Sequence, residues 1–133
     1  MKTKLIYSNI NYHVVFCPRF RRQIFKNLEL RTRFKEIATN TCNVNDITLN
    51  KVEFGMDYVL LNITALPNHT PTKIIRVIKE STGNILISEF EELRHMQNLW
   101  TNNFLIKTEQ ITTDELTSFV ASQKKNSRRD KYE

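Results

Sequence analysis

Apolar residues recur along this chain with two different periods, and the order in which the two patterns follow one another limits its possible folds. Residues 5–17 alternate as a β-strand does, and Pro18 closes the run. One strand face carries Ile10, Tyr12, Val14 and Phe16. In residues 28–42 the apolar positions return at helical spacing instead. The chain is therefore expected to begin with a strand followed by an amphipathic helix.

Two further strands are expected after this helix, over residues 46–54 and 57–66, with a tight turn at Gly55 and Met56 between them. A second helix is expected to follow. Thr70 and Pro71 have the residue types of a helix N-cap and first turn, and Gly83 is the expected end.

The remaining third of the chain has weaker patterns. A helical piece is expected over residues 85–97 and a strand over 104–108. Residues 112–115 read Thr-Thr-Asp-Glu, a capping box that opens a final helix ending near Gln123. Residues 124–133 carry five lysines or arginines against two acids and are expected to form a basic tail.

The order strand–helix–strand–strand–helix–strand is typical of an α+β, ferredoxin-like (RRM-like) split β-α-β sandwich. Such a fold has an antiparallel sheet with helices on one face, and here a C-terminal helix is added. We expect one domain over residues 1–123 followed by the tail at 124–133, since 133 residues can bury one core.

The chain is basic, with a formal net charge of +6 and a pI near 9.5, which favours polyanionic partners.

No apolar run is long enough to cross a membrane and no signal-peptide core is present, so we expect a cytoplasmic protein. Two distant cysteines, Cys17 and Cys42, are read as buried apolar residues. Candidate nucleic-acid-binding residues form two clusters, one in the turn after the first strand and one expected to face outward from the second helix, and a tryptophan is added to them: Arg19, Arg21, Arg22; Lys73, Arg76, Lys79; and Trp100.

Two segments carry a resemblance to a known family. Residues 12–22 read Tyr-His-Val-Val-Phe-Cys-Pro-Arg-Phe-Arg-Arg, and residues 99–104 read Leu-Trp-Thr-Asn-Asn-Phe. Both are similar to blocks of the small tyrosine transposases of the IS200/IS605 group, and the resemblance extends over about residues 10–123. It implies a dimeric enzyme that recognises DNA hairpins. In that family two histidines of one strand hold a divalent metal, and a helix-borne tyrosine attacks the DNA phosphate.

The resemblance also implies that the reaction centre is degenerate here. The two histidine positions fall on Tyr58 and Leu60, and the nucleophile position falls on Phe119. Gln123 is the matching metal ligand that remains, expected on the same helix face as Phe119. Leucine and phenylalanine offer no ligand or nucleophile, and a protonated phenol is a poor ligand. We therefore expect no metal, no cofactor and no transposase activity.

The hypothesis that follows is an inactive relative that binds DNA or RNA hairpins, with a homodimer retained. It is either a host regulator or a decaying remnant of a mobile element. Trp100 is read as a base-stacking ring or as core packing, and the basic residues as phosphate contacts or as an ordinary wet surface. Two alternatives stay open: a dimeric protein-interaction scaffold without nucleic-acid binding, and residual activity through Tyr58 or Tyr132. His13, His69 and His95 lack ligand spacing.

Overall fold

The computed structural model describes residues 9–123, so the expected basic tail at 124–133 lies outside the described part. The strands are β1 (Ile10–Phe16), β2 (Thr48–Phe54), β3 (Val59–Ala65) and β4 (Leu105–Lys107). The α-helices are α1 (Leu28–Val44), α2 (Pro71–Glu89) and α3 (Thr113–Ser122). Short 3-10 turns, η1 (Arg19–Arg21), η2 (Ile24–Lys26) and η3 (Glu91–Leu93), complete the order.

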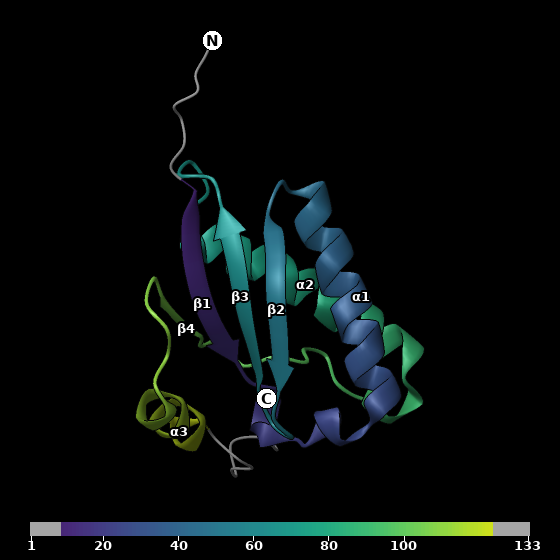
Figure 1. Cartoon of the computed structure of the whole chain (residues 1–133). Helices are drawn as coiled ribbons and strands as arrows, with labels where there is room; N and C mark the ends of the chain where they lie inside the picture. The colour runs from purple at the N-terminus through teal and green to yellow at the C-terminus, as the bar shows by residue number, and fades with distance from the viewer. Residues whose placement is uncertain (1–8, 124–133) are drawn as a thin grey trace.

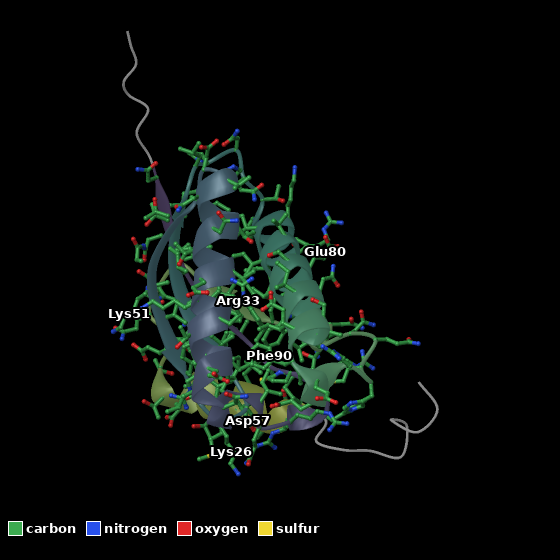
Figure 2. All side chains as sticks on the ribbon, turned by 90° about the vertical axis from the view of Figure 1, so that its right-hand side faces the viewer. Lys26, Arg33, Lys51, Asp57, Glu80 and Phe90 are labelled. Atoms are coloured by element: carbon green, nitrogen blue, oxygen red, sulfur yellow. The ribbon has the colours of Figure 1, made fainter. Side chains whose placement is uncertain are left out.

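The four strands form one antiparallel sheet in the order β2-β3-β1-β4 (Figure 1). The register of the central pair runs from Ile10 opposite Ala65 to Phe16 opposite Val59. Helices α1 and α2 pack side by side against the same face of the sheet, as Figure 2 shows from the side. The expected α+β, ferredoxin-like sandwich with helices on one face is confirmed.

The core lies between the sheet and the helix pair. The strand face expected to turn inward does so, since Tyr12, Val14 and Phe16 are all buried. Aromatic rings fill one end of this layer: the ring of Phe16 packs edge-on against that of Trp100, with centroids 4.7 Å apart. Phe25 and Phe34 extend the cluster, and neither is exposed. Offset and edge-on ring pairs add to the energy of area burial alone.

The expected helix end at Gly83 is wrong, because α2 runs through that residue to Glu89. Gly83 is buried, and a Cβ placed on it would lie 3.3 Å from Nε1 of Trp100. The glycine is there for close packing, not for a turn. The separate helix expected over residues 85–97 is wrong for the same reason, since its first residues belong to α2 and only the turn η3 follows.

No helix within the described residues is long and apolar enough to span a membrane.

Replacing Gly83 with valine should lower the free energy of unfolding by about 1–3 kcal/mol, the usual cost of overpacking a core. The added methyl groups would press on the indole of Trp100, which is itself buried against the ring of Phe16. Urea denaturation measures the destabilisation, with the milder Gly83→Ala as the matched control. Equal stability of Gly83→Val and the wild type would show that the packing here is not tight.

Candidate nucleic-acid interface

The first basic cluster, Arg19, Arg21 and Arg22, lies in the turn that follows β1. Main-chain hydrogen bonds fix this turn to a segment far away in the sequence. The amide of Arg19 donates to the carbonyl of Leu99 at 2.7 Å, and the amide of Thr101 donates to the carbonyl of Cys17 at 3.0 Å. Pro18 and Trp100 thus form an antiparallel bridge that continues β1 by one pairing. Residues 99–101 therefore hold the start of this turn in place through main-chain hydrogen bonds.

The backbone of this turn is strained. Phe20 has φ 62° and ψ 18°, and Arg21 has φ 52°. Both lie in the left-handed region, which bulky residues rarely occupy and which costs of the order of 1–3 kcal/mol per residue. The Phe20 side chain is partly buried here, and two guanidinium groups lie over its ring. Those of Arg19 and Arg22 lie 5.3 Å and 5.6 Å from its centroid.

Arg21 has a different role from its two neighbours. Its Nε donates to the carboxylate of Asp57 at 3.1 Å, and both side chains are partly buried. Asp57 belongs to the turn between β2 and β3, at one end of the molecule (Figure 2). This ion pair joins two loops, so the guanidinium of Arg21 is already neutralised. Arg22, which is exposed, is the better candidate for a phosphate contact.

The second expected cluster lies on α2. Lys73 and Arg76 are exposed, in agreement with the expected outward face. Lys79 differs, because it is only partly exposed and its Nζ donates to the carbonyl of Thr101 at 2.5 Å. That Nζ also lies 5.7 Å from the ring centroid of Phe16. Burial lowers the pKa of Lys79 to about 8. The expectation of an outward Lys79 is therefore wrong.

Trp100 is part of the core and is not an exposed stacking ring. Its side chain is 5% exposed, and its indole N–H donates to Oγ1 of Thr82 at 3.1 Å. The expectation that it stacks on an unpaired base is wrong. The alternative of core packing is confirmed. The sequence could not separate the two, because an indole serves both purposes and its neighbours in space come from α2.

Sequence reasoning missed a hollow beside the first cluster. It has a volume of about 380 Å³ and combines aromatic, cationic and amide side chains. Its lining residues are Arg19, Phe20, Arg22, His95, Met96, Gln97 and Asn98. His95, Gln97 and Asn98 are exposed. The sequence indicated only that His95, Gln97 and Asn98 are polar and precede the 99–104 block, which does not reveal a hollow.

The degenerate reaction centre implied by the resemblance maps to the other face of the sheet. Leu60 lies on that face, opposite Val15 of β1, and lines a hollow of about 230 Å³. Tyr58 stands just before β3, where its ring covers Gly55 so closely that a Cβ on that glycine would collide with it. The phenol is thus packed on the β2–β3 turn.

The last helix begins as expected, with the capping box of Thr112 and Glu115 formed in both directions. It ends at Ser122, so Gln123 is its C-cap with extended dihedrals. The side-chain amide of Gln123 is buried and donates to the carbonyl of Phe119 at 3.2 Å. Gln123 therefore caps the helix and does not lie within it, and its side-chain amide is directed at the main chain of Phe119, one turn earlier. Phe119 itself is partly exposed.

The donors on this face do not suit a divalent metal. One ring nitrogen of His13 lies 3.4 Å from the amide of Asn62, and Glu53 is paired with Lys51 at 2.8 Å. One imidazole and one neutralised carboxylate are a poor set compared with the several anionic or imidazole ligands that such ions need. Within residues 9–123 no group of three or more histidine, cysteine, aspartate or glutamate side chains could hold a metal ion.

Comparison with known sequences gives matches to the transposase family that residues 12–22 and 99–104 resemble. Residues 6–123 match the model of the family described as "Transposase IS200 like". The transposase for insertion sequence element IS200 of Salmonella typhimurium is 21% identical over 118 residues, covering 86% of this chain and 77% of that protein. The ISDra2 transposase TnpA of Deinococcus radiodurans is also 21% identical over 118 residues, with 86% and 84% covered.

Comparison with solved structures supports the same fold. A protein assigned as a transposase in Deinococcus radiodurans superposes with a TM-score of 0.82 at 23% identity, covering 93% of this chain and 98% of that one. A REP-associated tyrosine transposase bound to a REP hairpin has a TM-score of 0.58 at 11% identity, with 89% and 67% covered. At these identities the likeness shows the fold alone.

The lowered pKa of Lys79 predicts a specific pH dependence of stability. Between about 8, its pKa in the folded protein, and the usual 10.5, the unfolded chain binds more protons at this residue than the folded one. Stability from Lys79 should therefore rise with pH across that interval. Urea denaturation at several pH values would measure it. The slope should be smaller in Lys79→Met, whereas parallel curves for the two proteins would contradict the assignment.

Proposed function

The chain belongs to the family of IS200-like transposases, and from that premise we propose that it is a catalytically inactive member that binds nucleic-acid hairpins. The observation that carries the binding half of this proposal is the turn after β1. Arg19 and Arg22 flank a partly buried aromatic ring there, on a chain of net charge +6. Cations beside an aromatic surface are what phosphates and unpaired bases bind. A relative of the same fold is bound to a REP hairpin, which supports this choice of ligand.

The proposed loss of catalytic activity follows from the side chains at the positions that correspond to the metal ligands and the nucleophile. Leu60 and Phe119 carry no atom that ligates a metal or attacks a phosphate, and Tyr58 is a poor ligand while protonated. The phenol of Tyr58 is packed over Gly55, which does not favour it as a replacement nucleophile. Tyr132, the other candidate, lies outside the described residues. Without a polarising metal or a nearby base, phosphoryl transfer has no electrostatic support.

A role as a dimeric regulator that reads hairpins without cutting them is consistent with this proposal. The alternative is a protein-interaction scaffold, in which the sheet face once used for chemistry has become a contact surface. Leu60 on that face is the observation that favours the alternative, since it presents an apolar side chain at the wall of a surface hollow. The two functions differ in salt dependence, because only phosphate contacts release counterions.

The purified protein should bind labelled DNA and RNA hairpins at low salt, with an affinity that falls steeply as salt increases. Replacing Arg22 with glutamine should reduce the magnitude of the salt slope by about one, for the phosphate that is no longer neutralised. Arg33→Gln is the matched control. Its guanidinium is held by Glu89 at 2.7 Å and Glu36 at 3.2 Å, so this substitution should leave the slope unchanged.

The same mixtures, incubated with magnesium or manganese and resolved under denaturing conditions, should contain no covalent protein–DNA adduct. An adduct that disappears in Tyr58→Phe or Tyr132→Phe would contradict the inactive assignment. Absence of hairpin binding at low salt would instead contradict the binding assignment, and salt-insensitive association with a protein partner would favour the scaffold.

A further inference from the structure

The turn between β2 and β3 supports the segment that carries Arg22, the candidate for a phosphate contact. Nε of Arg21 donates to Oδ2 of Asp57 at 3.1 Å, and the amide of Phe25 donates to the carbonyl of Met56 at 3.2 Å. Arg22 lies between these two anchor points in the sequence. The β2–β3 turn therefore holds the chain on both sides of Arg22.

The ion pair of Arg21 with Asp57 has the properties of a positioning contact. The two side chains are 26% and 18% exposed, so solvent and salt screen their attraction less than they screen an exposed pair. Arg21 also has a left-handed backbone, with φ 52°, which a non-glycine residue keeps only where the surrounding structure holds it. Removing the carboxylate would leave a partly buried guanidinium without its counterion, and the turn would then rearrange.

We propose that Asp57 is a positioning residue for hairpin binding: its ion pair with Arg21 holds the exposed guanidinium of Arg22 at the hollow that Arg22 and His95 both line. This inference rests on the proposed function and extends it to a residue outside the lining of that hollow. Asp57 precedes Tyr58, to which the resemblance maps a metal ligand. The candidate interface and the degenerate reaction centre are thus joined by one ion pair.

Charge alone predicts the opposite effect of Asp57. A carboxylate repels phosphates, so its removal would strengthen binding to a polyanion and would free the guanidinium of Arg21 for a further phosphate contact. The salt slope would then grow in magnitude by about one. A positioning role predicts weaker binding and no gain in slope, because Arg22 is no longer held in place. The sign of the change therefore separates the two roles.

The test measures the affinity for a labelled DNA hairpin at several salt concentrations. Asp57→Asn should bind the hairpin about two- to 30-fold more weakly than the wild type at low salt, the range typical of substitutions that act through an intervening residue. The magnitude of its salt slope should stay the same or fall by up to about one. Asp57→Glu, which keeps the carboxylate, should retain most of the affinity.

A second pair of variants keeps Asp57 in place. Arg21→Gln breaks the same ion pair from the other side, so it should displace Arg22 as Asp57→Asn does. Arg22→Gln should therefore weaken binding less in the Arg21→Gln background than in the wild type. Equal losses in both backgrounds would show that Arg21 does not position Arg22.

Glu89→Gln is the matched control. It also removes one carboxylate and breaks an ion pair with an arginine, since Oε1 of Glu89 accepts from Nε of Arg33 at 2.7 Å. Neither Glu89 nor Arg33 lines the hollow beside Arg22, so the affinity of this variant should equal that of the wild type or slightly exceed it. Urea denaturation shows whether each variant is folded under the binding conditions.

The outcomes separate this inference from the function on which it rests. Tighter or unchanged binding by Asp57→Asn would overturn the positioning role while hairpin binding by the wild type stands. Failure of the wild type to bind the hairpin at low salt would overturn the proposed function itself.

Discussion

The docking of residues 99–101 against the end of β1 is the interaction on which the rest of the molecule depends. Two main-chain hydrogen bonds, from the amide of Arg19 and from that of Thr101, pair the segments. The pairing inserts Trp100 among the core rings and against Gly83, and truncating such a buried indole to alanine costs about 3–5 kcal/mol. It also fixes the Arg19–Arg22 turn and brings residues 95–98 beside it. One buried indole thus sets the shape of the candidate interface.

The periodicity of apolar residues was sufficient to predict the strands and helices that turn one face toward the core. Alternation in β1, helical spacing in α1 and the capping box at Thr112 all correspond to observed structure. It was not sufficient at Gly83, where a residue typical of helix ends is used for close packing, nor at Trp100, whose burial depends on α2. The roles of Gly83 and Trp100 are set by contacts between segments that are distant in the sequence. Local secondary-structure propensities carry no information about such contacts.

The candidate site was predictable only in part. Arg19, Arg22, Lys73 and Arg76 could be chosen from charge alone, but the pairing of Arg21 with Asp57 and the hydrogen bond from Lys79 to Thr101 depend on tertiary structure. Phe20 could not be chosen, because its significance lies in its left-handed backbone and in the hollow that it lines. On the opposite sheet face, Leu60 and the paired side chains of Lys51 and Glu53 leave little for metal chemistry. The proposed binding surface is therefore separate from the sheet face to which the resemblance maps the reaction centre.

That separation is the central claim, and mapping a hairpin onto the protein by NMR would test it most directly. Backbone amide shifts would be followed as a DNA hairpin with a single-stranded extension is added to the labelled protein. The account predicts that the shifts gather at Phe20, Arg22, His95 and Asn98, and that those of Leu60 and Asn62 remain unchanged. Shifts concentrated at Leu60, Asn62 and His13 would contradict it, because they would place the nucleic acid on the sheet face instead.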